Sequence, residues 1–473
     1  MGKPTGFMDF SRQDPSKRPV AERLRDYAEL EIALAPEEIH HQAARCMDCG
    51  VPHCHDYGCP LQNRIPDWND LVYRGQWRKA LDWLHATNNF PEITGRICPA
   101  PCETSCTLAI NREAVCIRHI EYQIAERGWE EGWIQPEIPE IRTGRQVAVV
   151  GSGPCGLSAA QQLARQGHKV TVFEKMDRPG GLLRYGIPDF KLDKKVIDRR
   201  IGQMQAEGVL FETGVEAGCD LSVKYLQRTF DALLVSIGAG EPRDLSLPGR
   251  NRKGIHFAMD FLTQQNRQVA GDAVPAAEKI EVRGKAVVVL GGGDTGADCV
   301  GTSLRQGARQ VIQIEILPKP PGERASKNPW PTWPNVLRTS SSHEEGCERQ
   351  WGWKTTEFLG SDGRVQAIRC IQVGNPDAEG RFPEIPGTER EFPADLVLLA
   401  AGYLHAEHGP LVTGSELDLD SRGNVRVNSG FQTSVPGIFA AGDTVTGASL
   451  VVRVMYQGRM AAAAIDRYLS RKP

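Results

Sequence analysis

Two glycine-rich turns constrain this chain more than any other feature. The first, Gly151-Ser-Gly153-Pro-Cys-Gly156, follows the apolar run Gln146–Val150 and opens a helix-compatible stretch, and Glu174 ends the next apolar run. In a βαβ unit the first glycine permits a tight turn, the second lets backbone N–H groups approach a pyrophosphate, and the third lets helix and strand pack closely. The pattern predicts a dinucleotide site in which Glu174 accepts hydrogen bonds from a ribose of FAD or NAD.

The same pattern recurs further along the chain. Gly291-Gly-Gly293-Asp294-Thr295-Gly296 follows Ala286–Leu290, and Glu315 lies near the end of the next apolar run. Two such turns predict one resident flavin and one nicotinamide nucleotide, because hydride transfer requires the two rings to be in contact. Glu315 favours NADH because a carboxylate repels a 2′-phosphate, whereas Lys319 and Arg324 could neutralise that phosphate. Both NADH and NADPH therefore stay open as the donor.

A later segment also points to a flavin. Pro436–Thr446 contains a short apolar strand that ends in Gly442-Asp443, and the helix-compatible stretch Val454–Tyr468 follows. A helix N-terminus can face the flavin, while Asp443 can bond a ribityl hydroxyl or cap the turn. Pairing of this segment with the first turn predicts a discontinuous FAD domain.

Eight of the 13 cysteines are concentrated near the N-terminus. Their pattern is C-x2-C-x4-C-x4-C-Pro, then C-Pro-x2-C-x3-C, then one further cysteine. Iron–sulfur clusters take four ligands each, and bacterial ferredoxins share these short spacings and the proline after a cysteine. The pattern therefore predicts two four-ligand clusters. The eight residues are Cys46, Cys49, Cys54, Cys59, Cys98, Cys102, Cys106 and Cys116.

Two other interpretations of the cysteines, a zinc site and a redox-active disulfide, match the spacing less well. Structural zinc sites favour paired C-x2-C knuckles, and only Cys46 and Cys49 have that spacing, although His53 and His55 lie close by as further possible ligands. A disulfide reductase would use a C-x4-C pair, but the pairs formed by Cys54 with Cys49 and Cys59 precede the flavin turn instead of following it.

Charge and hydropathy exclude other classes. Lys and Arg number 56 and Asp and Glu 59, so the net charge of −3 creates no basic field for nucleic acid or an anionic membrane. The apolar runs are much shorter than the roughly 18 residues that a membrane span needs. The start, MGKPTGFMDF, has no apolar stretch typical of a signal peptide. We therefore expect a cytoplasmic protein without a nucleic-acid or membrane partner.

The expected fold class is α/β, with an N-terminal α-helical iron–sulfur domain followed by two Rossmann-like (βαβ) dinucleotide-binding domains. The prolines and glycine of Ile134–Gly144 mark a boundary after the helical region. We expect the iron–sulfur domain over residues 1–143, the FAD domain over 144–283 and 390–473, and the NAD(P)H domain over 284–389.

Taken together, these motifs resemble the small (beta) subunit family of glutamate synthase. The resemblance covers essentially the whole chain, and its broader relatives are the adrenodoxin-reductase-like flavoproteins and the N-terminal half of dihydropyrimidine dehydrogenase. The matching stretches, beyond the cysteines and the first turn, are Arg178–Leu192, Gly291–Asp298, Asn328–Pro334, Ser340–Gly346 and Gly437–Thr444.

The resemblance implies an electron-input subunit. NAD(P)H would give a hydride to FAD, and single electrons would pass through two 4Fe-4S clusters to a large (alpha) subunit that makes glutamate from glutamine and 2-oxoglutarate. It also implies that Gly181 and Leu182 contact the FAD. One cluster would take Cys46, Cys49, Cys54 and Cys106. The other would take Cys59, Cys98, Cys102 and Glu121, although Cys116 stays open as the eighth ligand.

No general acid or base is assigned, because the flavin supplies the chemistry. We treat His343, Glu344 and Glu345 as structural or interface residues. The alternative enzyme is a cluster-bearing NAD(P)H oxidoreductase of the ferredoxin-linked type. A remote alternative is a non-catalytic module that senses nucleotides and holds zinc.

Overall fold

The N-terminal region is helical and loop-rich, as expected. A computed structural model describes residues 2–471, so Met1 and residues 472–473, at the outer ends of the two expected terminal domains, lie outside the described residues. A small hairpin pairs β1 (Ser16–Lys17) with β2 (Glu31–Ile32). The helices are α1 (Gly6–Asp9), α2 (Val20–Arg23), α3 (Pro36–Ala44), α4 (Ile65–Tyr73), α5 (Trp77–His85), α6 (Pro91–Ile97), α7 (Pro101–Thr104) and α8 (Ile117–Glu130), with a π-helical turn at Cys54–Gly58 and a 3-10 turn at Thr107–Ile110.

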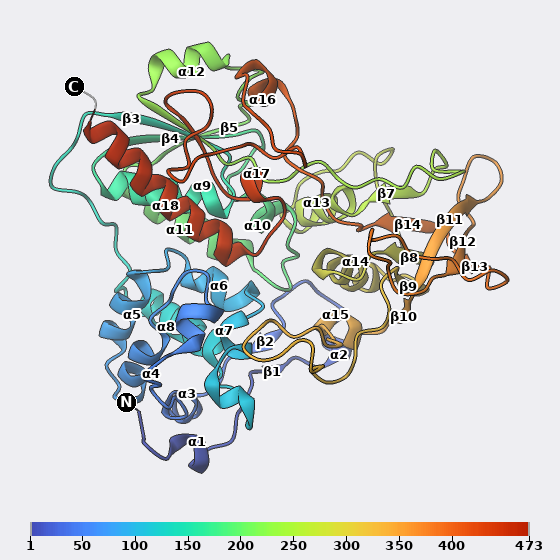
Figure 1. Ribbon diagram of the computed structural model, residues 1–473, viewed down its shortest axis with the longest axis horizontal. Coiled ribbons are helices and arrows are strands. Elements are labelled where there is room, and N and C mark those ends of the chain that lie inside the picture. The colour runs from blue at the N-terminus through green and yellow to red at the C-terminus, as the bar shows by residue number, and fades with distance from the viewer. Residues whose placement is uncertain (1, 472–473) are drawn as a thin grey trace.

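The first glycine turn belongs to a five-stranded parallel sheet ordered β15-β6-β3-β4-β5. Its central strands read as continuous apolar runs because helices cover both faces (Figure 1). The strands are β3 (Gln146–Val150), β4 (Lys169–Glu174), β5 (Leu210–Thr213), β6 (Ala232–Val235) and β15 (Ile438–Ala440). The helices of this unit are α9 (Pro154–Arg165), α10 (Leu182–Tyr185), α11 (Lys194–Ala206), α12 (Val223–Thr229), α16 (Pro410–Gly414), α17 (Asp443–Thr446) and α18 (Val451–Ser470).

The second glycine turn belongs to another parallel sheet, ordered β10-β9-β8-β14-β7, and an antiparallel sheet β11-β12-β13 extends beyond it. The strands are β7 (Ile255–Phe257), β8 (Ala286–Leu290), β9 (Gln310–Glu315), β10 (Glu348–Trp351), β11 (Trp353–Leu359), β12 (Ala367–Gln372), β13 (Arg390–Pro393) and β14 (Leu396–Leu399). The helices are α13 (Ala258–Val269), α14 (Asp294–Arg305) and α15 (Ser341–Glu344). The α/β class with two Rossmann-like units is therefore confirmed.

The sheet topology differs from the expected domain boundaries. Both β7 and β14 pair with strands of the second sheet, although residues 255–257 and 396–399 lie outside the 284–389 assigned to the second domain. A three-residue strand such as β7 has no recognisable apolar run, and β14 has no glycine turn to mark its unit. We therefore propose that the second unit runs from β7 to β14.

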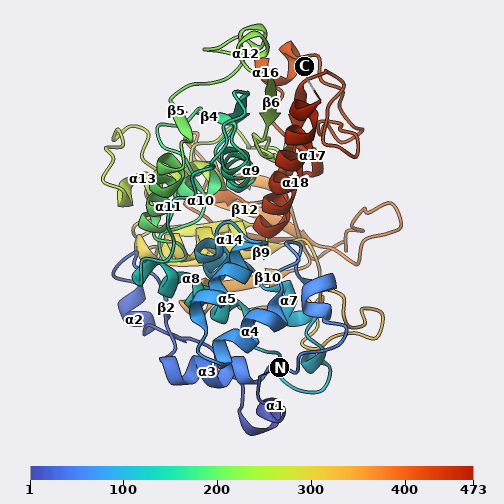
Figure 2. The ribbon, with the colours of Figure 1, turned by 90° about the vertical axis from the view of Figure 1, so that its left-hand side faces the viewer.

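The three regions lie against one another. Figure 2 shows the N-terminal helices at one end, α14 and the strands of the second sheet in the middle, and α12 and α16 at the far end. Of the helices in residues 2–471, none combines the length and apolarity that crossing a membrane would require.

Helices α9 and α18 pack closely because glycines leave room between them. A Cβ atom at Gly458 would lie 2.3 Å from the Cys155 carbonyl oxygen, and one at Gly442 would lie 2.9 Å from the Cys155 Cβ. The Ser158 hydroxyl also donates a hydrogen bond across the contact to the Met455 carbonyl, at 3.1 Å. The C-terminal segment therefore closes directly onto the first glycine turn.

Gly458→Ala should reduce the free energy of unfolding by about 1–3 kcal/mol, because the added methyl group overpacks the contact between α9 and α18. Gly202→Ala is the matched control: this helical glycine has no atom within 4 Å of an added Cβ. Helix propensity predicts that the control gains about 0.5–1 kcal/mol. Urea unfolding measures both variants, and equal stability of the two would contradict this packing argument.

Candidate functional site

In the first turn, each glycine position has a different steric environment that explains the absence of a side chain. Gly151 has φ of +98°, and a Cβ there would lie 2.5 Å from the Ser236 carbonyl oxygen. A Cβ at Gly156 would lie 2.0 Å from the Gly151 carbonyl oxygen, whereas Gly153 has open space beside it. The turn is thus fixed by its first and third glycines, and its second is free for a close ligand.

The second turn repeats this arrangement. Gly291 has φ of +129°, and a Cβ there would lie 2.1 Å from the Ala400 carbonyl oxygen. A Cβ at Gly296 would lie 2.3 Å from the Gly291 carbonyl oxygen, and Gly293 again has open space. Both turns can therefore present helix N-terminal N–H groups to a phosphate.

The two acidic residues brace their own turns, a role that the sequence analysis did not anticipate. Glu174 accepts hydrogen bonds from the backbone N–H groups of Ser152 at 3.0 Å and Met176 at 2.9 Å. Glu315 accepts the equivalent bonds from Gly292 at 2.6 Å and Leu317 at 3.2 Å. A carboxylate has about four acceptor positions, so each acid still has capacity for a ribose hydroxyl.

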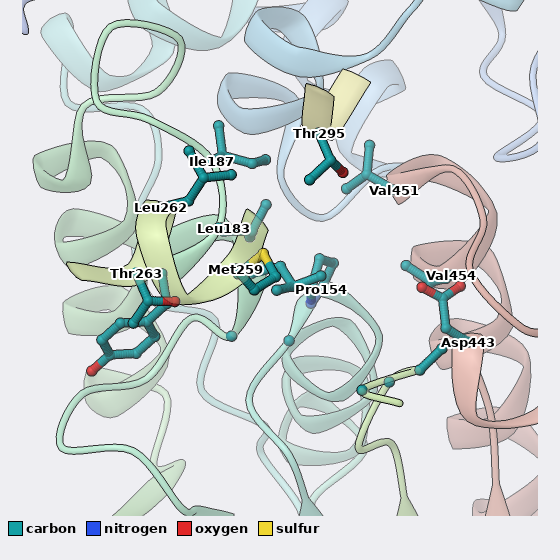
Figure 3. Close-up of a pocket in the computed structure, with 18 of the residues that line it drawn as sticks. Pro154, Leu183, Ile187, Met259, Leu262, Thr263, Thr295, Asp443, Val451 and Val454 are labelled. Carbon is teal, nitrogen blue, oxygen red and sulfur yellow. The ribbon is translucent and has the colours of Figure 1, made fainter. Parts of the chain in front are cut away.

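One cavity of about 930 Å³ lies between the two turns. Figure 3 shows the side chains around it, with Met259 from α13, Thr295 from α14 and Val451 from α18. Eight residues predicted from sequence line it: Gly151, Gly153, Glu174, Gly181, Leu182, Asp294, Thr295 and Asp443. The other predicted nucleotide residues shape the turns and are outside this lining: Gly156, Gly291, Gly293, Gly296, Glu315 and Gly442.

Helix α17 contributes the acidic side chain of Asp443 to the cavity. Its carboxylate accepts a hydrogen bond from the Ser449 hydroxyl at 2.7 Å. Burial raises the pKa of Asp443 to about 6, because the ionised form loses solvation. A hydroxyl-rich ligand placed here would restore hydrogen bonds to that carboxylate.

Four cysteine thiols line a second, small pocket in the N-terminal region: Cys46, Cys49, Cys54 and Cys106. We call them the first thiol group. Burial raises the pKa of Cys46 to about 11, so the pocket favours neutral thiols in the absence of a cation. Four sulfur ligands around one pocket match the donor set of an iron–sulfur cluster, in which each thiolate binds a different iron atom.

The second thiol group consists of Cys59, Cys98, Cys102 and the carboxyl group of Glu121. Burial raises the pKa of the Cys102 thiol, and the charges of Cys59, Cys98, Glu103 and Glu121 raise it further. Glu121 is buried and accepts hydrogen bonds from Asn88 at 3.2 Å and Asn63 at 3.3 Å. Burial raises the pKa of Glu121 to about 7.

Cys116 is not among the residues that line the pocket of the first thiol group. Its thiol contacts the Asp14 carboxylate at 3.7 Å, and the other charges that act on it belong to Glu103, Arg12 and Arg118.

Among residues 2–471, no three His, Cys, Asp or Glu side chains converge as a single metal ion would require.

The thiol groups adjoin the rest of the molecule at two places. Ile97 and Pro99, which flank Cys98, line the large cavity. The loop Asn328–Pro334 of the second unit, which contains Trp330 and Trp333, packs on the turns that carry the first thiol group. The Trp330 ring makes an edge contact with the His53 ring, with 4.7 Å between the ring centres. The Ser105 hydroxyl donates a hydrogen bond to the Pro331 carbonyl at 3.1 Å.

Sequence reasoning missed one wall of the cavity. The N-terminal hairpin supplies Glu29, Leu30, Glu31 and Ala33, and the helices beside it supply Arg96 and Arg118. These residues carry no motif, because their role depends on contacts with distant segments.

Comparison with known families divides the chain in the same way. Residues 145–463 match the family described as pyridine nucleotide-disulphide oxidoreductase. Residues 23–133 match the family described as dihydropyrimidine dehydrogenase domain II, 4Fe-4S cluster. These matches support an enzyme that uses FAD, NAD(P)H and 4Fe-4S chemistry.

Three curated relatives span the chain. The glutamate synthase [NADPH] small chain of Mycobacterium tuberculosis is 52% identical, covering 99% of this chain and 96% of the relative. That of Bacillus subtilis is 45% identical, covering 99% of each. The glutamate synthase [NADH] of Schizosaccharomyces pombe is 46% identical, covering 98% of this chain but 23% of that longer protein.

Among solved structures, FprA from Mycobacterium tuberculosis has a TM-score of 0.55 at 20% identity, covering 69% of this chain and 85% of that one. This likeness supports the arrangement of the two dinucleotide units. The full-length identities identify the family: the chain belongs to the glutamate synthase small chains, NAD(P)H-dependent oxidoreductases with a flavin and an iron–sulfur domain.

Proposed function

We propose that this chain is the electron-input subunit of a glutamate synthase. It takes a hydride from NAD(P)H on FAD and passes single electrons through two 4Fe-4S clusters to a large chain, which converts glutamine and 2-oxoglutarate to two glutamates. The observation that carries the proposal is the continuity of the large cavity, which extends from Thr295 past the first glycine turn to Pro99 beside Cys98.

The FAD, when bound, converts a two-electron hydride donor into a source of single electrons. The N-terminal N–H groups of α9 and the open side of Gly153 would hold its pyrophosphate. Glu174 would accept bonds from the ribose, and Asp443 from the ribityl chain. Gly181 and Leu182 would lie against the same cofactor, since both line the cavity.

The nucleotide would bind at the second turn. Gly291, Gly293 and Gly296 would let the pyrophosphate approach α14, while Asp294 and Thr295 border the cavity where the nicotinamide must reach the flavin. Arg324 donates a hydrogen bond to the Thr332 carbonyl at 2.7 Å within its own loop. Because its guanidinium is used there, its position does not distinguish NADPH from NADH. Both donors therefore enter the test.

The two thiol groups would each hold one 4Fe-4S cluster. The first offers four sulfur ligands, and the second offers three sulfurs and the Glu121 carboxylate. Cys98 places the second thiol group next to the cavity. Electrons from the flavin would therefore reach the second group first and leave the chain through the first group. Cys116 interacts with Asp14 and Glu103 and would not be a ligand.

Anaerobic titration with NADPH and, separately, NADH tests the function. We expect one nucleotide to bleach the flavin absorption and to support reduction of an artificial dye. Gly293→Leu should keep FAD but weaken nucleotide binding at least about tenfold, because its side chain would occupy the pyrophosphate position. A flavin that neither nucleotide bleaches would refute the proposal.

Iron analysis of chains produced together with the large chain tests the ligand assignment. Cys54→Ser and Cys102→Ser should each lose about four irons per chain, because each removes a ligand of a different cluster. Glu121→Ala should lose iron, whereas Cys116→Ser, another buried thiol, should retain it. Loss of iron from Cys116→Ser with retention in Glu121→Ala would reverse the assignment of the eighth ligand.

Exposed apolar side chains near the first thiol group mark the proposed contact with the large chain. Val51, Tyr57 and Ile110 are each more than half exposed and lie within four residues of a ligand cysteine. A buried contact here would bring the exit cluster close to the partner.

The double substitution Val51→Asp with Ile110→Asp should leave NAD(P)H-dependent dye reduction within about twofold, because surface changes away from the cavity have small effects. Glutamate synthesis with the large chain should fall strongly, since two carboxylates would be desolvated at the contact. Ile141→Asp, in the exposed linker, is the matched control. Unchanged glutamate synthesis by the double variant would exclude this surface.

A further inference from the structure

The N-terminal arm, residues 16–33, bridges two regions of the molecule. It leaves the iron–sulfur domain, forms β1, α2 and β2, and reaches α15 of the second dinucleotide unit (Figure 1). Its return strand is fastened to the iron–sulfur domain by Glu31 with Arg118 at 2.6 Å and by Glu29 with Arg96 at 2.7 Å. The arm is therefore fixed at its base.

At the far end of the arm, Arg23 enters a buried charge cluster. Its guanidinium lies 3.4 Å from the Glu345 carboxylate and 3.6 Å from that of Glu344. Glu345 is also held by both terminal nitrogens of Arg305, at 2.5 and 2.9 Å. We call Arg23, Glu345 and Arg305 the arginine junction, and all three side chains are at most 3% exposed.

A buried junction of this kind tolerates little displacement. Removing two guanidinium groups and a carboxylate from water is costly, and only close pairing compensates for it. The Arg305–Glu345 pair is bidentate, which fixes its orientation as well as its distance. Within the described residues, the Nε and Nη1 atoms of Arg23 are buried without a hydrogen bond, so its charge is compensated by the ion pairs with Glu345 and Glu344. Sliding the second unit against the arm would lengthen these pairs and weaken that compensation.

The junction lies directly behind the cavity wall. The Arg305 guanidinium stacks 3.8 Å from the centre of the Phe190 ring, and Phe190 lines the cavity. The next residue, Lys191, also lines it and forms an ion pair with Asp298 of α14. The junction therefore joins the arm, the helix of the second turn and a loop of the first unit.

We propose that the arm fixes the second dinucleotide unit against the first, and that Arg23 is a positioning residue for hydride transfer. The inference rests on the proposed function, because it concerns how the nicotinamide meets the flavin. Such transfer requires reacting atoms about 3–3.5 Å apart, and a small misplacement lowers the rate strongly. The iron–sulfur domain thus serves the nucleotide step as well as the electron exit.

Arg23→Gln tests the proposal without leaving a carboxylate unpaired, because Glu345 keeps its two bonds from Arg305. Anaerobic rapid mixing with saturating NAD(P)H should show the limiting rate of flavin reduction lowered about tenfold. FAD and iron contents and reduction by dithionite should match the wild type. Arg23→Lys, which restores the charge, should recover most of the rate.

Lys17→Ala is the matched control, because Lys17 pairs with Glu344 at 2.7 Å on the same arm but is 36% exposed. Its limiting rate should equal that of the wild type. An unchanged rate in Arg23→Gln, or an equal loss in Lys17→Ala, would overturn the positioning role. If Arg23→Gln loses its cofactors, Arg23→Lys becomes the test. A limiting rate of flavin reduction in Arg23→Lys equal to that of the wild type supports the need for a positive charge at this position. An Arg23→Lys chain without cofactors overturns the positioning role. A wild-type flavin that NAD(P)H does not reduce would instead refute the proposed function.

Discussion

The contact of Gly442 and Gly458 with Cys155 is the constraint on which the rest of the structure depends. It joins two segments that are far apart in sequence, the first glycine turn and the C-terminal segment, and the two glycines leave room for the Cys155 and Ser158 side chains between them. Because α18 approaches so closely, Asp443, Val451 and Val454 become one wall of the cavity, as Figure 3 shows. The second unit, the arm and the iron–sulfur domain then enclose the space that this contact creates.

The iron–sulfur domain contacts the second unit at two separate places. Trp330 and Pro331 pack on turns that carry the first thiol group, while Arg23 enters the junction with Glu345. The second dinucleotide unit and the first thiol group are therefore held together by contacts of different kinds, one aromatic and one ionic. This arrangement suits a chain that must align a hydride transfer and then lead single electrons away from it.

Local features were predictable from sequence because they depend on backbone geometry. The positive φ of Gly151 and Gly291, and the crowding at Gly156 and Gly296, leave glycine as the only residue that fits. The family resemblance separates the cysteines into two groups, and the four cysteines that it assigns to one cluster line one pocket.

Long-range features were not predictable in this way. The pair of Arg23 with Glu345 joins distant parts of the chain, and Arg23 belongs to no motif that would identify it as the partner of Glu345. Strand β7 is too short to give an apolar signal, so the sequence could not indicate the start that we propose for the second unit. The hydrogen bonds by which Glu174 and Glu315 brace their turns were also not predictable, because a sequence fingerprint specifies a residue type and not its partners.

We propose that one chain holds a nucleotide cavity beside two iron–sulfur sites. Anomalous X-ray scattering at the iron absorption edge, from anaerobic crystals of the small chain with its large chain, would locate the iron directly. We expect two iron peaks in this chain, one among Cys46, Cys49, Cys54 and Cys106 and one beside Cys98 and Glu121. A zinc signal at these positions, or iron in only one thiol group, would contradict it.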